Sequence, residues 1–279
     1  MRVARVSGRL ALLLDGGAVD VETASHGRFP RDPDDAMPRW DELRDWAAGY
    51  GGGEVVPYTA ADVGAPLVRP AQVFGIGLNY RDHAAESGVA VPSAPAVFTK
   101  FRTCLTGPYD AVLLPSGTVD WEVELVAVIG RRAENVAAER AWSYVAGVTV
   151  GQDLSERSVQ LAGPVPQFSL GKSFPGFGPF GPAIVTPDEL ADPDDLALAC
   201  CLDGEVLQKG RTRDMVFSVP ELVARLSAIC PLLPGDLIFT GTPPGVGMAR
   251  TPPRFLRGGT TLVSTIEGVG ELRTPLVAT

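Results

Sequence analysis

The sequence predicts an α+β fold that is rich in strands. Short apolar runs recur along the chain of 279 residues, and turns that draw on its 32 glycines and 25 prolines separate them. The runs do not alternate with helical segments in the regular way that a doubly wound parallel sheet requires. We therefore expect a mixed, strand-dominated architecture in which one large domain follows a small N-terminal one.

The first 67 residues are predicted to form the small α+β domain. Residues 3–6 and 10–14 are expected to pair as a hairpin, and residues 41–50 to form a helix that ends at three glycines. Residues 54–67 are expected to supply a short linker strand and a loop. The larger domain is then expected to span residues 68–279.

Apolar runs between Gly/Pro turns predict the strands of the larger domain. They cover residues 73–77, 96–100, 112–114, 121–129, 144–150, 183–185, 197–202, 237–240, 260–266 and 270–274. Helices are expected over residues 81–87, 137–140, 155–161 and 218–229. Ser218 and Pro220 suit the start of the last helix, and Asp203-Gly204 is typical of a hairpin turn.

The composition narrows the class of protein. Hydrophobic residues make up 45% and charged residues 20%, which is an ordinary globular balance, and the formal charge of −9 argues against a nucleic-acid partner. No apolar stretch approaches the roughly 20 residues of a membrane span. The four cysteines have neither C-x-x-C nor zinc spacing, so we expect reduced thiols in a cytoplasmic protein.

Two acids interrupt one of the most apolar predicted strands. Glu122 and Glu124 are two residues apart and so share one face of the strand, on which Val126 and Val128 follow. Acids seldom enter such a strand unless their charge is compensated, and a divalent cation would remove the repulsion between them. The alternative is a half-exposed strand with a solvated polar end.

Asp153 completes a candidate metal site. It follows the apolar run 144–151 and precedes the predicted helix 155–161, so it is alternatively the N-cap of that helix. Together with Glu122 and Glu124 it provides three oxygen ligands and no soft ones. Such a set favours magnesium, manganese or calcium over zinc, and leaves coordination positions for water and substrate.

Three further segments carry side chains suited to catalysis. Lys172 lies in an apolar, aromatic loop, where it is either a surface lysine or a cation placed beside developing negative charge. Thr242 lies in a Gly/Pro-rich loop that is either a plain turn or a carboxylate-binding loop. His83 and Glu86 are three residues apart on a predicted helix, either as an exposed pair or as a general-base dyad.

Taken together, these segments resemble the fumarylacetoacetate hydrolase family over about residues 70–272. They occur in the order Asn79-Tyr80 to Glu86, Glu122-Val123-Glu124, Asp153 with Arg157 and Gln160, Gly171-Lys172-Ser173-Phe174, and Gly241-Thr242-Pro243. Three positions depart from the family's usual residues, namely Gln152, Ser158 and Pro175.

The resemblance implies a mixed β-sandwich roll, usually a homodimer, with magnesium or manganese held by Glu122, Glu124 and Asp153. It implies that Lys172 polarises the substrate and that His83 and Glu86 form a dyad on a mobile lid. It further implies a set of substrate-side residues, namely Asn79, Tyr80, Arg157, Gln160 and Thr242.

The expected reaction is hydrolysis of a carbon–carbon bond in a 2,4-dioxo acid such as an acylpyruvate. His83 would deprotonate a water that attacks the distal carbonyl, and the metal and Lys172 would stabilise the charge that is released. The alternatives at the same site are decarboxylation of oxaloacetate, which needs only the chelating ion, and isomerisation or hydration of a hydroxymuconate-type diacid, which needs the ion and a proton shuttle. A non-catalytic, metal-dependent small-molecule binder is a further alternative. No motif indicates the substrate's distal group.

Overall fold

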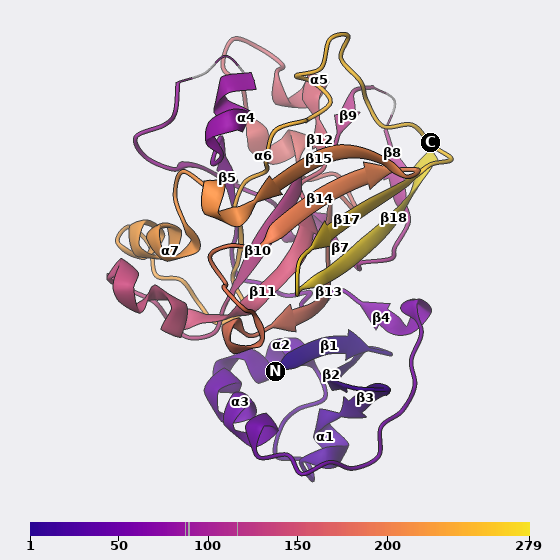
Figure 1. Cartoon of the computed structure of the whole chain (residues 1–279), viewed down its shortest axis with the longest axis vertical. Helices are drawn as coiled ribbons and strands as arrows, with labels where there is room; N and C mark the ends of the chain where they lie inside the picture. Colours follow the sequence, from indigo (N-terminus) through magenta and orange to yellow (C-terminus); the bar gives the residue numbers. More distant parts are fainter. Residues whose placement is uncertain (87, 89, 116) are drawn as a thin grey trace.

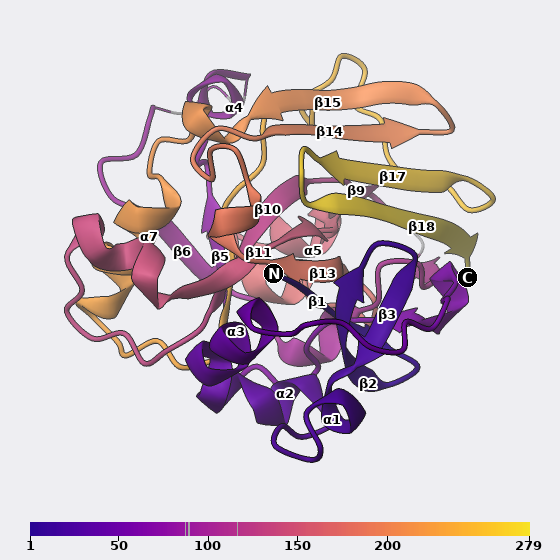
Figure 2. The same cartoon turned by 60° about the horizontal axis from the view of Figure 1, so that its bottom comes forward.

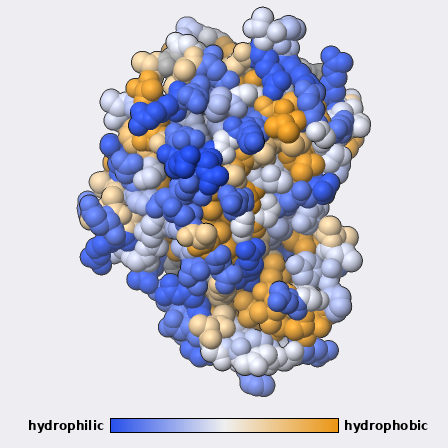
Figure 3. All heavy atoms as spheres, in the orientation of Figure 1, coloured by the Kyte–Doolittle hydropathy of each residue, from blue (hydrophilic) through white to orange (hydrophobic). Residues whose placement is uncertain are grey.

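The computed structural model describes residues 1–86, 88, 90–115 and 117–279. Within them the chain forms an eleven-stranded, a five-stranded and a two-stranded sheet. Figure 1 shows the N-terminal region packed against one end of the larger body, and Figure 2 shows strands β15, β14, β17 and β18 side by side in the five-stranded sheet. The predicted strand-rich α+β fold is confirmed. On the face in Figure 3, polar side chains surround smaller apolar patches.

The N-terminal region contains the predicted hairpin and helix. Its elements are β1 (Arg2–Val6), β2 (Arg9–Leu14), β3 (Gly17–Asp20), α1 (Val21–Ala24), α2 (Pro33–Ala36), η1 (Met37–Arg39), α3 (Trp40–Ala48), η2 (Ala60–Asp62) and β4 (Val63–Gly64). The sequence did not predict β3, α1 or α2. Asp20 starts α1, because its carboxylate accepts the Thr23 N–H at 2.8 Å.

The N-terminal region and the rest of the chain share a sheet and a hydrophobic cluster. β1 pairs antiparallel with β13 (Gly178–Val185), so the first strand belongs to the large sheet. Phe29 and Leu43 lie in the same buried cluster as Phe180 and Phe239. The interior is therefore continuous across residue 67, and the division into two domains remains a prediction.

The large sheet holds the most deeply buried strands. Its order is β3-β2-β1-β13-β11-β10-β16-β5-β6, with β4 on β1 and β7 on β13. Its remaining strands are β5 (Val73–Gly77), β6 (Ala96–Thr99), β7 (Leu105–Thr106), β10 (Val123–Ile129), β11 (Val145–Gln152) and β16 (Leu237–Phe239). Every residue of β10 is buried.

The two faces of β10 contact different hydrophobic clusters. Val123 and Leu125 belong to the cluster that includes the five-stranded sheet, whereas Val126 and Val128 belong to the cluster shared with the N-terminal region. A strand covered on both sides is apolar on both sides. The only acid of β10 is accordingly Glu124, at its second position.

The smaller sheets complete the strands. The five-stranded sheet has the order β15 (Glu205–Arg211), β14 (Ala197–Leu202), β17 (Thr261–Ile266), β18 (Gly270–Ala278) and β8 (Val112–Leu114), and the two-stranded sheet pairs β9 (Val119–Asp120) with β12 (Ser155–Glu156). The predicted turn between β14 and β15 is confirmed, with φ of +48° at Asp203 and +89° at Gly204.

Helices of the larger part are short. They are α4 (Arg81–Glu86), η3 (Arg102–Cys104), η4 (Ala138–Tyr144), α5 (Arg157–Gln160), α6 (Phe168–Gly171), η5 (Pro187–Glu189), η6 (Thr212–Asp214) and α7 (Val219–Ser227). Ser218 caps α7 as predicted, and the expected helix 137–140 is a 3-10 helix. Ser87, the last residue of the expected helix 81–87, lies outside the described residues. None of the described helices is long and apolar enough to cross a membrane.

The expected helix 155–161 begins later than predicted. Ser155 and Glu156 pair with Val119 and Asp120 in the small sheet, and Glu156 caps α5 by accepting the Ser158 N–H. The interpretation of Asp153 as a helix N-cap is therefore wrong. This acid lies between β11 and β12, free of a capping role.

Candidate active site

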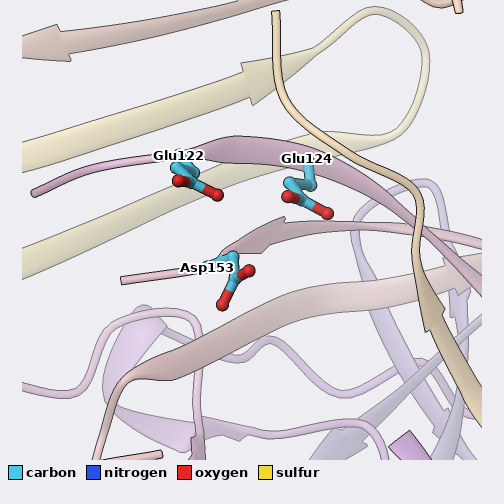
Figure 4. Close-up of side chains that lie close together, drawn as sticks. All are labelled: Glu122, Glu124 and Asp153. Atoms are coloured by element: carbon cyan, nitrogen blue, oxygen red, sulfur yellow. The ribbon is translucent and has the colours of Figure 1, made fainter. Parts of the chain in front are cut away.

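Two neighbouring strands bring the three predicted acids together. Glu122 precedes β10, Glu124 is its second residue, and Asp153 follows β11. The antiparallel register pairs Val123 with Gln152, and the Asp153 N–H donates to the Glu122 carbonyl at 2.9 Å. Each acid offers a ligand oxygen within 4.8 Å of the others, and Figure 4 shows the three side chains converging from the two strands.

The three acids are buried at 7%, 1% and 0% exposure, which concentrates negative charge away from water. Burial and the carboxylates of Asp153 and Glu122 raise the pKa of Glu124 well above its usual value. Burial acts in the same direction on Glu122, but Lys172 and Arg157 lower the pKa of that carboxyl to about 2. The neighbouring cations thus compensate the negative charge of Glu122 but not that of Glu124. A hard divalent cation fits this all-oxygen donor set and would supply the missing charge.

Two predicted basic residues contact the acids directly. The Lys172 ammonium donates to Glu122 Oε2 at 2.7 Å and to Asp153 Oδ2 at 2.6 Å. Arg157 donates to Glu122 Oε1 at 2.7 Å and to the Gln160 side-chain oxygen at 2.8 Å. Both basic side chains are almost completely buried, so their positions are held by these acids.

Lys100 is a buried cation that the sequence reasoning did not single out. Its side chain is fully buried, and its ammonium donates to Asp153 Oδ1 at 2.6 Å, to the Phe177 carbonyl at 3.2 Å and to the Lys172 carbonyl. It therefore fixes both an acid of the cage and the backbone of Lys172. The only signal was a lysine at the end of an apolar strand.

Asp120 is a second residue that the sequence reasoning missed. It is fully buried and accepts hydrogen bonds from Arg157 Nε at 3.0 Å and Nη2 at 2.7 Å. It also accepts the N–H groups of Gly247 at 2.6 Å and Met248 at 2.9 Å. Asp120 thereby connects α5 to the loop that follows β16.

Two of the three departures from the family pattern have clear structural roles. The Gln152 side-chain oxygen accepts the Glu122 N–H at 2.9 Å, and its amide donates to Ser264 Oγ at 2.8 Å. It therefore holds the backbone of Glu122 directly before the first residue of β10. The Ser158 hydroxyl donates to Glu156 at 2.6 Å and strengthens the start of α5.

His83 and Glu86 lie on the same side of α4. His83 Nδ1 is 2.7 Å from Glu86 Oε1, and the same carboxylate accepts the Gly245 N–H at 2.9 Å. Gly245 has a φ of +105°, and a Cβ there would collide with the Leu207 carbonyl. Glycine is thus required for the loop to bring its N–H to the dyad.

Most of the predicted site residues line a cavity of about 230 Å³. Those that line it are His83, Glu122, Arg157, Gln160, Lys172 and Thr242. The Thr242 hydroxyl already donates to the Val123 carbonyl at 2.9 Å and accepts from Gln208 at 2.8 Å. Its hydrogen is therefore engaged by the protein's own backbone.

Asn79 and Tyr80, expected beside the substrate, do not line this cavity. The Asn79 amide donates to the carbonyls of Phe217 and Thr240, which joins the segment between β5 and α4 to the end of β16. Tyr80 lines a separate cavity of about 220 Å³. A larger and open cavity of about 1020 Å³ lies along residues 250–257 and contains none of the predicted site residues.

The arrangement matches a known family. Residues 72–277 match the family model described as fumarylacetoacetate (FAA) hydrolase, C-terminal. The chain belongs to the fumarylacetoacetate hydrolase family. The resemblance read from the sequence is thereby confirmed, and with it the family's strand-rich fold.

Relatives of this family member include enzymes with different reactions. Bovine (Bos taurus) "Oxaloacetate tautomerase FAHD2A, mitochondrial" is 46% identical over 218 residues, which are 77% of this chain and 69% of that protein. An HpcE-like protein of Mycobacterium smegmatis has a solved structure that is 51% identical, covers all of both chains and superposes with a TM-score of 0.97. The solved structure of a Sphingobium maleylpyruvate hydrolase, in complex with manganese(II) and pyruvate, is 28% identical over 100% of this chain and 99% of that chain, with a TM-score of 0.81.

Proposed function

We propose that this family member is a divalent-cation-dependent hydrolase that cleaves a carbon–carbon bond of a 2,4-dioxo acid. The observation that carries the proposal is that His83, supported by Glu86, opens onto the same cavity as Glu122 and Lys172. A base that can activate water therefore faces the side chains that can stabilise negative charge. The bound manganese and pyruvate of the maleylpyruvate hydrolase support the same class of reaction.

The charge balance of the site suits an anionic substrate. The acid cage and Asp120 supply four buried carboxylates beside three buried cationic side chains, which leaves one uncompensated negative charge when Glu124 is ionised. The groups are Asp120, Glu122, Glu124 and Asp153 on one side and Lys100, Arg157 and Lys172 on the other. Addition of a divalent cation makes the site net positive by one, which matches one carboxylate of a dioxo acid.

The acid cage would hold magnesium or manganese, with calcium as a further candidate. When bound, the cation would draw negative charge from the substrate's oxygens as a Lewis acid. Lys172 lies in the cavity wall beside the cage and offers an ammonium donor to an oxygen that gains charge.

The dyad determines which nitrogen of His83 can act. Nδ1 donates its hydrogen to the Glu86 carboxylate, so the neutral imidazole keeps Nε2 free to accept a proton. We expect Nε2 to take a proton from water as the oxygen adds to the distal carbonyl. The carbon–carbon bond then breaks with release of a carboxylic acid, and its electron pair stays on the pyruvate part, which takes up a proton.

A matched pair of histidine variants tests this role. In His83→Asn we expect manganese binding to persist and pyruvate release from acetylpyruvate to fall by about 100-fold or more, because the base is lost. The control is His26→Asn, an exposed residue with a φ of +53° that asparagine tolerates. Glu122→Ala should lose both bound manganese, measured by electron paramagnetic resonance, and turnover. Full activity in His83→Asn or in chelator-treated enzyme would refute the proposal.

The second candidate is proton transfer without hydrolysis. The bovine relative is named an oxaloacetate tautomerase, and a dyad that moves one proton suits keto–enol exchange. Ultraviolet absorbance of the oxaloacetate enol, followed with magnesium and with manganese, distinguishes this activity from pyruvate release. Oxaloacetate decarboxylation and hydroxymuconate isomerisation or hydration belong to the same substrate panel, and binding without any turnover would indicate a non-catalytic protein.

The assembly and the location in the cell remain predictions. A homodimer and a cytoplasmic location were expected from the sequence. The bovine relative is described as mitochondrial. Sedimentation of the purified protein would test the dimer.

A further inference from the structure

The cavity beside the acid cage has two unlike parts. Its polar residues adjoin the acids, whereas the remaining wall is made of apolar side chains from β5 and the residue after it, from β6, from α6 and the segment before it, and from the loop after β16. Prominent among these are Leu78, Leu161, Pro166, Phe168, Val246 and Met248. A substrate anchored by its carboxylate at the cage therefore extends along an apolar wall.

The apolar wall begins directly at Lys172. Its ammonium lies 5.1 Å from the centroid of the Phe98 ring, and Phe98 packs edge-to-face on Phe168 with the centroids 5.6 Å apart. Leu78, also on the wall, has a φ of +55°, which an aliphatic residue keeps only where its surroundings enforce it. The wall is thus a packed part of the fold.

The cations of the cavity are already paired with acids, and Arg157 and Lys172 each keep only one N–H for a further acceptor. Arg157 is bound by Asp120, Glu122 and Gln160, and Lys172 by Glu122 and Asp153. Among the described residues that line the cavity, these two are its only lysine or arginine side chains. A carboxylate packed against the buried part of the apolar wall, for example at Val246, would lose its hydration without gaining a cationic partner, which is strongly unfavourable.

The volume limits the size of the distal group. The cavity has a volume of about 230 Å³, and the dioxo acid head uses part of that space, which favours a short distal group. We infer that the substrate is an acylpyruvate with a short, uncharged, apolar acyl group, and not one with a second carboxylate at its distal end. This inference rests on the proposed function, because it concerns the substrate of the same site.

Two substrates of similar size but different distal charge test this inference. In 4-methylpentanoylpyruvate the acyl chain ends in an isopropyl group, and in succinylpyruvate a carboxylate takes its place. With manganese-loaded enzyme we expect kcat/KM for the first acid to exceed that for the second by about 100-fold or more, because the carboxylate would be buried unpaired. Calorimetric titration of both acids into manganese-loaded His83→Asn should give the same preference in binding.

A cation placed on the wall should reverse part of this preference. Leu161 lines the cavity but is 48% exposed, so Leu161→Arg brings a guanidinium to the distal part with little disturbance of packing. We expect the preference for the apolar acid to fall by about 10-fold or more. The control is Leu170→Arg on α6, where the residue is 65% exposed and outside the cavity lining.

The outcomes distinguish this inference from the proposed function. Equal or faster hydrolysis of succinylpyruvate by the unmodified enzyme would overturn the inference and leave the hydrolase proposal standing. If neither acid releases pyruvate but the apolar acid binds more tightly, the hydrolase proposal fails and the inference holds. An unchanged preference in Leu161→Arg, or no binding of either acid, would overturn the inference.

Discussion

At the scale of single residues, the buried charges of the site depend on specific neighbours, and Lys100 is a clear case. Its ammonium is one of two that contact Asp153 and also binds two backbone carbonyls. Because the Lys100 side chain is fully buried, water does not reach these acceptors to replace its ammonium.

Lys100→Met keeps most of the side-chain volume and removes the charge. Without a divalent cation we expect the free energy of unfolding in urea to fall by about 3–5 kcal/mol, because a buried carboxylate loses a partner. Manganese should then raise the melting temperature of the variant more than that of the unmodified protein, because the cation restores positive charge.

The third lysine of the chain supplies the control for this prediction. Lys209 is exposed on β15, so Lys209→Met should leave both quantities unchanged. Equal stability of the Lys100 and Lys209 variants in chelator would contradict the assigned role of Lys100.

At the scale of elements, local sequence patterns predicted the bounds of several strands and the start of one helix correctly. β5, β8 and β14 have the predicted bounds, and α7 begins after Ser218 as expected. Strand β10 begins two residues late, at Val123, because the ladder to β11 starts there and the Gln152 side chain binds Glu122 instead. No local pattern reports such long-range pairing.

The capping box of α7 provides a prediction at this scale. Ser218 accepts the Glu221 N–H, and Glu221 in turn accepts the Ser218 N–H at 2.9 Å. Ser218→Ala should destabilise the protein by about 1 kcal/mol, a fall of roughly 2 °C in melting temperature. Because α7 does not line the candidate site, turnover at 25 °C should be unchanged. Ser218→Thr should melt close to the original temperature, and an equal fall in both variants would argue against a capping effect.

At the scale of the whole molecule, the N-terminal region covers one face of the large sheet. Phe180 and Phe239 lie in the cluster that also holds Phe29 and Leu43, and β1 extends the sheet from β13. A chain of residues 68–279 alone would expose this face and leave β13 without one of its partners.

We expect the isolated 68–279 fragment to aggregate or to lose its cooperative melting transition. Co-expression with a separate 1–67 fragment should recover a soluble complex, because the lost contacts are non-covalent. Calorimetry and sedimentation provide the measurements. A monomeric 68–279 fragment that melts near the temperature of the full chain would instead support the predicted division into two domains.

The sequence by itself determined the strand-rich class, the family and the three acids that converge at the site. The shared face of Glu122 and Glu124 follows from the local period of two, whereas the family, and with it the place of Asp153 beside them, follows from the order of the motifs along the chain. Only the tertiary structure decided that Lys100 and Asp120 hold the acids and Arg157, that Asn79 and Tyr80 lie outside the cavity, and that its distal wall is apolar. The physical reason is that these contacts join residues far apart in the chain, and the packing of the sheets, which no local pattern encodes, brings them together.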